Sequence, residues 1–136
     1  MSISHQIETL RSCGQVICGI YHGKQVIDTK SRLKACGLDK MGFGVCSKIE
    51  KQDAKVLAQN ALQKHIWTEQ EVLSNEKSKK ACDIFFSALH GDFELYTNYM
   101  WGGIEPISHN FIDKGILAVS KQGVVGILWV VDDEQP

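Results

Sequence analysis

Residues 116–131, ILAVSKQGVVGILWVV, decide the fold of this chain. Two apolar runs, Ile116 to Ser120 and Val124 to Val131, flank the polar stretch Lys121-Gln122-Gly123. Apolar and β-branched residues favour strands, and a glycine in a short connection can adopt the positive φ that a tight turn needs. The pattern therefore predicts a hairpin of two strands in the core of the protein.

Three segments that precede this hairpin have strand-like or ambiguous patterns. Gln15 to Tyr21 (QVICGIY) is apolar and ends before a His-Gly turn, which predicts a buried strand. Met41 to Ser47 (MGFGVCS) indicates a strand weakened by two glycines. Residues 93–101 (FELYTNYMW) alternate imperfectly, so strand and helix stay equally open there.

Apolar residues spaced three and four apart predict two longer helices. The clearest runs from Gln52 to Gln63, where alanines and leucines recur on one face. Thr68 and Glu71 form a capping box, which predicts the start of a second helix. Gly91 is expected to end that helix, and the two helices are expected to pack as a hairpin.

The length of 136 residues suits one core and is too short for two, so we expect a single domain over residues 1–136. Short helices from Ser2 or Ser4 to about Arg11, and over residues 29–37, complete the expected elements. A loose tail is expected over residues 132–136. The predicted fold class is α+β, with a helical hairpin and further short helices packed on a mixed or antiparallel sheet.

The composition argues against several classes of function. Fifteen Lys and Arg against sixteen Asp and Glu leave a net charge of −1, which provides no basic field for a nucleic-acid backbone. The five cysteines include no CxxC pair, and no apolar run approaches the roughly 20 residues that span a bilayer. Because no N-terminal signal segment is evident, we expect a cytoplasmic protein with reduced thiols and no membrane partner.

The sequence gives little support for a catalytic site or a metal-binding site. A thiol nucleophile needs a base nearby, which leaves Cys82 with His90, or Cys46 with His109, to be considered. Cys82 lies beside an apolar stripe, so a buried structural role is favoured for it. The histidines lie far apart in the sequence, so no metal ligand, cofactor or catalytic residue is predicted.

Residues 96–110 form the most unusual segment, because aromatic, amide and hydroxyl side chains gather there without clear periodicity. Rings can enclose a flat ligand while polar groups fix its edge, which is the usual make-up of a small-molecule pocket. An equally open interpretation is that the rings cap the core or a subunit interface. The ligand-binding candidates are Tyr96, Asn98, Trp101, His109 and Asn110, with Lys121 as a partner for a phosphate group.

The order of elements resembles the HutP family, the antiterminators of the histidine-utilisation operon. The resemblance rests on three stretches between Met41 and Ile127, namely MGFGVCSKIEKQDAKVL, SALHG and GILAVSKQGVVGI. It implies helices packed against a sheet, and a homo-oligomer based on dimers and extending to a hexamer. Where the family has a pair of metal-binding histidines, this chain has Lys79 and Asp83, and VVDDEQP lacks the family's C-terminal histidine ligand. The metal switch of the family is therefore not expected here.

The chain also looks similar, in size and assembly, to phage proteins that sequester immune signalling nucleotides, of the anti-Thoeris sponge type. The leading hypothesis is a non-enzymatic oligomeric protein that sequesters or senses a small planar anion, such as a cyclic nucleotide or a cyclic ADP-ribose-type signal. If the chain is viral, its compartment is the host cytoplasm. One alternative is an RNA-binding antiterminator that uses Lys77, Lys79 and Lys80, which the low net charge disfavours. A second alternative is a hydrolase that uses cysteine and histidine.

Overall fold

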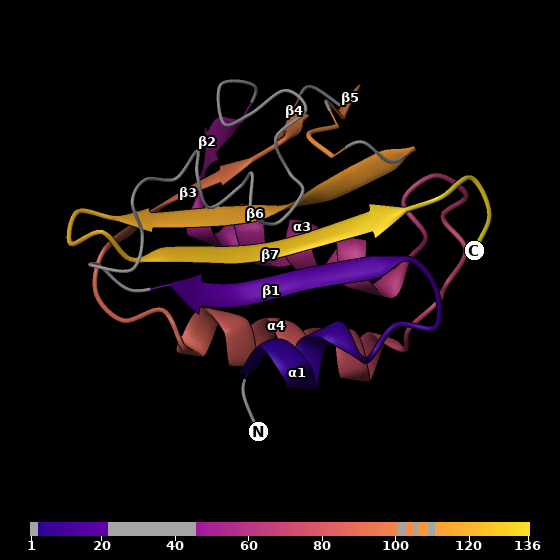
Figure 1. The fold of residues 1–136 in the computed structure, drawn as a ribbon, viewed down its shortest axis with the longest axis horizontal. Coiled ribbons are helices and arrows are strands. Elements are labelled where there is room, and N and C mark those ends of the chain that lie inside the picture. The colour runs from indigo at the N-terminus through magenta and orange to yellow at the C-terminus, as the bar shows by residue number, and fades with distance from the viewer. Residues whose placement is uncertain (1–2, 22–45, 101–102, 105, 109–110) are drawn as a thin grey trace.

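The computed structural model describes residues 3–21, 46–100, 103–104, 106–108 and 111–136. The helices are α1 (Ile3–Glu8), α3 (Lys51–Gln63) and α4 (Asn75–Ser87), and the strands are β1 (Gln15–Tyr21), β2 (Ser47–Ile49), β3 (Phe93–Thr97), β4 (Tyr99–Met100), β5 (Gly103–Ile104), β6 (Ile112–Ser120) and β7 (Val125–Asp132). Within the described ranges, three helices pack on one face of a five-stranded antiparallel sheet of order β1-β7-β6-β3-β2 (Figure 1). β4 and β5 form a separate two-stranded sheet. The predicted α+β class is confirmed in this form.

The predicted hairpin lies at the centre of the sheet. β6 and β7 pair with Ile116 opposite Leu128, and β6 begins earlier than predicted, at Ile112. The Gly123 N–H donates to the Ser120 carbonyl at 3.2 Å, and Gly123 has φ 84, as a glycine at this turn allows. On its other side β7 pairs with β1 over the whole of the range predicted for that strand.

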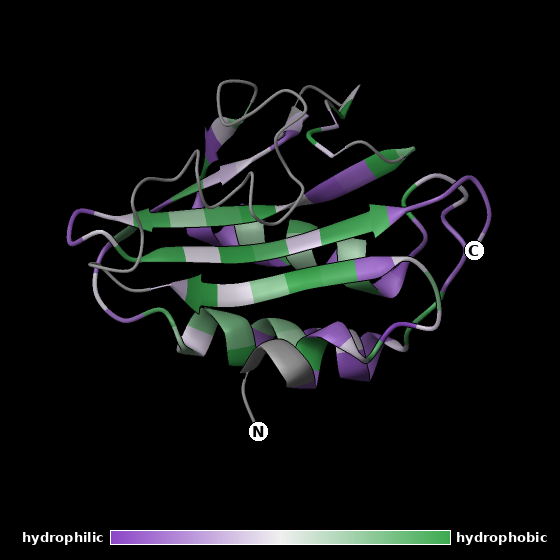
Figure 2. Cartoon of the chain, viewed as in Figure 1, coloured by the Kyte–Doolittle hydropathy of each residue, from purple (hydrophilic) through white to green (hydrophobic). Residues whose placement is uncertain are grey.

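The central strand β7 is buried on both of its faces. Leu128 and Val130 belong to the apolar cluster under the helices, while Ile127 and Trp129 belong to a second cluster on the opposite face. In Figure 2, most of β7 is green, the colour of hydrophobic residues. Antiparallel strands with one wet face alternate between apolar and polar residues, whereas a strand covered on both sides reads as a continuous apolar run. This is why residues 124–131 show no alternation.

α3 confirms the first of the two longer helices. Its stripe of small and branched side chains packs on the sheet and on α4, and its buried members are Ala54, Leu57, Ala58, Ala61 and Leu62. The helix predicted at the N-terminus is also present as α1, but it ends at Glu8 rather than near Arg11. The Arg11 side chain instead bonds to Asp132 of β7.

The start and the end predicted for α4 are wrong. Ser74, not Thr68, is its N-cap, and the Ser74 hydroxyl accepts the Lys77 N–H at 3.2 Å. The Thr68 hydroxyl accepts the N–H of Gln70 at 3.3 Å inside a turn. Thr68 and Glu71 thus match the sequence pattern of a capping box, but no helix begins at Thr68. The helix ends at Ser87, and Gly91 follows it with φ 89.

In the segment 93–101, for which strand and helix were both open, β3 and β4 form strands on either side of Asn98. β3 gains partners on both sides, because Leu95 lies opposite Ile49 of β2 and opposite Ala118 of β6. Residues 29–37 and 41–45, where a helix and most of a strand were predicted, lie outside the described residues. At the other end of the chain Asp132 is buried in β7, so the predicted loose tail is wrong for this residue.

Among the described residues, no helix combines the length and the apolar character needed to cross a membrane.

Candidate functional site

The structure describes three of the six sequence-predicted ligand residues, and it does not bring Asn98 and Lys121 together. Trp101, His109 and Asn110 lie outside the described residues. Asn98 follows the C-terminal end of β3, whereas Lys121 follows Ser120, which pairs with the first residue of that strand. At about 3.3 Å per residue, the two positions are separated by roughly 15 Å along the strand. They therefore do not face one small ligand.

Each of the three described candidates has neighbours that point to another role. The Tyr96 hydroxyl donates to Glu94 at 2.7 Å. Lys121 borders a hollow of about 370 Å³ that it shares with Asp92 and Glu94, whose negative charges disfavour an anion there. Asn98 is 1% exposed and points into the protein rather than into a pocket.

Asn98 belongs to a buried polar cluster around Asp113. Its amide nitrogen donates to the Asp113 carbonyl (2.8 Å) and carboxylate (3.0 Å). The same carboxylate accepts the indole N–H of Trp129 and the backbone N–H groups of Ile107 and Ser108, at 2.8–3.0 Å. These bonds fasten the segment 106–108 to the sheet, because a buried carboxylate needs several donors. Asn98 thus takes part in the hydrogen bonding of this buried cluster.

The exposed apolar surface of the described chain gathers at another place. Its exposed large apolar side chains are Val56, Trp67, Tyr99 and Phe111, between 37% and 62% accessible. The rings of Trp67 and Phe111 stack edge to face, with centroids 5.2 Å apart. Trp67 and Tyr99 line one cavity, and Val56 and Tyr99 line the hollow beside it. Apolar groups gathered around a cavity mark a binding surface more often than scattered ones do.

The cavity has a volume of about 460 Å³ and lies between the C-terminal end of α3, the turn that follows it, the β4–β5 sheet and β6. The adjoining hollow, about 410 Å³, runs along α3 past Ile49 and Val56. Asn60, Tyr99 and Lys114 line both. We call the two together the Lys114 groove. Each of the two volumes is in the range of pockets that hold small organic ligands.

Lys114 supplies the positive charge at the centre of this groove. Its Nζ lies 4.5 Å from the centroid of the Tyr99 ring and 3.4 Å from Asn60 Oδ1. Burial lowers the pKa of Lys114 below its ordinary value of 10.5, and the negative charge of Glu69 partly opposes this shift. Lys114 forms no ion pair with any carboxylate in the described ranges. A half-buried ammonium without such a partner attracts anions.

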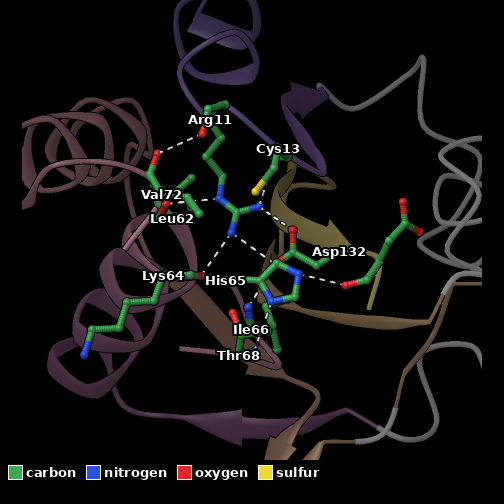
Figure 3. A network of polar contacts seen from close by, with 11 residues as sticks. Arg11, Cys13, Leu62, Lys64, His65, Ile66, Thr68, Val72 and Asp132 are labelled. Atoms are coloured by element: carbon green, nitrogen blue, oxygen red, sulfur yellow. Dashed lines mark hydrogen bonds and ion pairs between the residues drawn. The ribbon is translucent and has the colours of Figure 1, made fainter. Parts of the chain in front are cut away.

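One wall of the groove is the turn that follows α3, and a buried polar network fixes this turn (Figure 3). The Arg11 guanidinium donates to both carboxylate oxygens of Asp132, at 2.6 and 3.0 Å, and to the carbonyls of Leu62 and Lys64. Asp132 in turn accepts the N–H of Ile66 at 2.9 Å. The first and last described segments of the chain thus hold the end of α3 between them.

His65 completes this network from within the turn. Its side chain is buried, and its Nδ1 accepts the Thr68 N–H at 3.1 Å. Nε2 therefore carries the proton and donates to the Asp133 carbonyl at 2.7 Å. This pair of bonds fixes the ring orientation beside Ile66 and Trp67, which line the groove.

Thiol chemistry finds little support in the described residues. Burial raises the pKa of Cys82 to about 12 and that of Cys46 to about 11, so both thiols are protonated near neutral pH. His109, the base considered for Cys46, lies outside the described residues. No group of three or more His, Cys, Asp or Glu suited to a metal is found in the part of the chain that the structure describes.

Sequence reasoning missed most of the groove, because its residues come from α3, β2, β4, β5, β6 and the turn that follows α3. Tyr99 lies in the aromatic segment singled out from the sequence, but Asn60, Trp67 and Lys114 do not. One signal was available: Lys114 is a lone cation just before the apolar run of the hairpin, where a solvated position is not expected.

Comparisons of the chain with protein-family models, with curated proteins and with solved structures give no match.

Proposed function

We propose that this chain is a cytoplasmic, non-enzymatic and homo-oligomeric protein that binds a small planar anion in the Lys114 groove. One observation carries the proposal: the half-buried Lys114 ammonium contacts the Tyr99 ring and the Asn60 amide, and it forms no ion pair with a described carboxylate. Cyclic nucleotides and cyclic ADP-ribose-type signals belong to the ligand class that the proposal covers.

The energetics of a buried charge support an anionic ligand. Removing an ammonium from water costs free energy that a cation–π contact of about 0.5–1 kcal/mol repays only in part. An anion placed beside Lys114 restores the missing partner, and a flat ligand body gains contact with the rings of Tyr99 and Trp67. The cavity lining holds two cations, Lys64 and Lys114, and one carboxylate, Glu69, while Asp53 lines the adjoining hollow. An anion is therefore favoured on the cavity side of the groove.

The resemblance to the HutP family and to nucleotide-sequestering phage proteins adds support from the overall architecture. Helices on one face of a sheet are what the HutP resemblance implies, and a sponge needs a pocket without a catalytic set. Self-association is part of the proposal because a second copy would cover the exposed Trp67 and Phe111 rings. An RNA-binding role is less well supported, since Lys77, Lys79 and Lys80 are exposed on a helix that also carries Glu76 and Asp83.

The test is calorimetric titration with cyclic mononucleotides, cyclic ADP-ribose isomers and 2-naphthoate, on the wild type and on Lys114→Met. We expect at least one of these anions to bind the wild type, and the variant to bind it about tenfold more weakly, because it loses a charged partner. The variant should stay as stable as the wild type to within about 1 kcal/mol, since methionine keeps the packing and removes a half-buried charge.

Lys55→Met is the matched control. Lys55 is also half-buried on an aromatic ring, with Nζ 5.9 Å from the centroid of Phe86, but it lies outside the groove. This variant should bind like the wild type. If no anion of the panel binds the wild type, or if both variants lose affinity equally, the proposal is wrong. Sedimentation of the same samples reports the oligomeric state.

A further inference from the structure

Glu69, on the wall of the Lys114 groove, has a backbone conformation that favours glycine. Its φ is 62, and it is the one non-glycine residue of the described chain with a positive φ. The other described positions of this kind are Gly14, Gly91 and Gly123. A side chain in this region of φ is strained, because the Cβ approaches the backbone too closely.

The turn around Glu69 requires this conformation. The Glu69 N–H donates to the His65 carbonyl at 2.9 Å, and the His65 N–H donates to the Gln70 carbonyl at 2.8 Å. His65 itself is held by Thr68 and by Asp133. The turn is thus overdetermined by its surroundings, and a glycine at position 69 would adopt the same path without strain.

The strained residue bears a carboxylate on the groove. Glu69 is exposed and lines the same cavity as Lys114, and its charge acts on the Lys114 ammonium. The two side chains nevertheless form no ion pair. One cavity of about 460 Å³ is therefore lined by a cation and by an anion that are not paired with each other.

We propose that Glu69 is a specificity-determining residue: among planar anions held by Lys114, it selects those that also carry an N–H or O–H donor. The inference rests on the proposed function of the groove. A carboxylate repels an anion that lacks a donor, whereas it accepts a hydrogen bond from one that carries it. Two charges of opposite sign across one cavity thus define a ligand with an acidic group and a separate donor group, as nucleotides and hydroxylated aromatic acids have.

The experiment compares 2-naphthoates that carry a hydroxyl or a methoxy group at position 6 or 7. The methoxy group matches the hydroxyl in place but cannot donate. We expect the wild type to bind one of the hydroxyl isomers about tenfold more tightly than its methoxy partner, as a hydrogen bond to a charged group predicts. The affinities are measured by calorimetry.

Variants of Glu69 should change the two affinities in opposite directions. In Glu69→Gln and Glu69→Gly, we expect the hydroxyl ligand to bind more weakly and the methoxy ligand to bind slightly more tightly. Glu69→Gly should also raise Tm by about 3 °C, because it relieves the strained φ. Glu71→Gln, two residues away and outside the cavity lining, is the matched control and should leave both affinities unchanged.

The outcomes separate this inference from the proposed function. If no naphthoate binds the wild type, and the nucleotides do not bind either, the groove is not an anion site and both proposals fail. If naphthoates bind in a manner that depends on Lys114 but hydroxyl and methoxy forms bind equally, only the role of Glu69 is wrong. A Glu69→Gly variant that lowers Tm and weakens both ligands alike would show that Glu69 serves the turn alone.

Discussion

Two neighbouring regions at the end of α3 differ in how many partners their buried charged groups have. In the network of Arg11, Asp132 and His65, both side chains of the ion pair are at most 1% exposed and every charged group has hydrogen-bond partners. In the Lys114 groove beside it, a half-buried ammonium has a ring and a weakly placed amide. A buried charge whose hydrogen bonds are all made within the protein indicates a structural role. A buried charge that lacks such partners indicates a group that binds a ligand.

The largest expected effect comes from breaking the satisfied region. Asp132→Ala leaves the buried Arg11 guanidinium without its carboxylate and the Ile66 N–H without an acceptor, so the free energy of unfolding should fall by about 3–5 kcal/mol. Urea denaturation measures this loss. The control is Glu94→Ala, which removes the Lys48–Glu94 pair, where both side chains are more than half exposed. That variant should change stability by less than about 1 kcal/mol.

A loss of less than about 1 kcal/mol for Asp132→Ala would contradict the comparison, because the network would then be no stronger than a surface pair.

An intermediate effect on stability is expected at Asn98, a residue predicted from the sequence to bind ligand. It distinguishes a buried structural amide from a ligand-binding one. Asn98→Ala removes the amide that donates to Asp113 inside the protein, so we expect a loss of about 2 kcal/mol in the free energy of unfolding. Because Asn98 lies outside the groove, the affinity of the folded protein for 2-naphthoate should stay unchanged. Tyr96→Phe, which removes an exposed hydroxyl bond to Glu94, is the milder control. A weaker affinity in Asn98→Ala at unchanged stability would return this residue to the site.

The smallest effect on stability, and the most diagnostic one, is the pH dependence at Lys114. Its pKa is lowered in the folded protein, so between that value and 10.5 the unfolded chain binds more protons. Stability should therefore rise with pH in this window in the wild type relative to Lys114→Met. Anion affinity should fall over the same window, because the ammonium is lost. Glu69, Lys64 and Asp53 are the other charged groups that line the groove.

Calorimetry and thermal unfolding at several pH values above 7 measure both trends. An anion affinity that does not change up to pH 10.5 would show that Lys114 is not the group that binds.

The elements that could be predicted from the sequence are those with a strong local signal. The hairpin of β6 and β7 follows from two apolar runs around a glycine turn, and α3 follows from apolar spacing on one helix face. α4 was misplaced because Thr68 and Glu71 match the pattern of a capping box. The N–H of Thr68 is taken by the His65 ring and that of Ile66 by Asp132, and neither partner can be identified from the local sequence.

The candidate site shows the same limit more strongly. The sequence singled out the aromatic segment after the helical hairpin, and Tyr99 of that segment lines the groove. The other predicted residues in the described part were judged by type alone, so the buried amide of Asn98 could not be told from a ligand-binding one. Whether a buried amide or ammonium group finds hydrogen-bond partners depends on residues that lie elsewhere in the chain.

The sequence by itself determined the class of the fold, because the periodicity of apolar residues is a local property that sets helices, strands and their buried faces. Tertiary structure alone decided where charge is satisfied and where it is not. Arg11 meets Asp132 across 121 positions, and Lys114 meets Asn60 across 54. The free energy of a charge depends on the groups that replace its water, and only the folded chain brings those groups together.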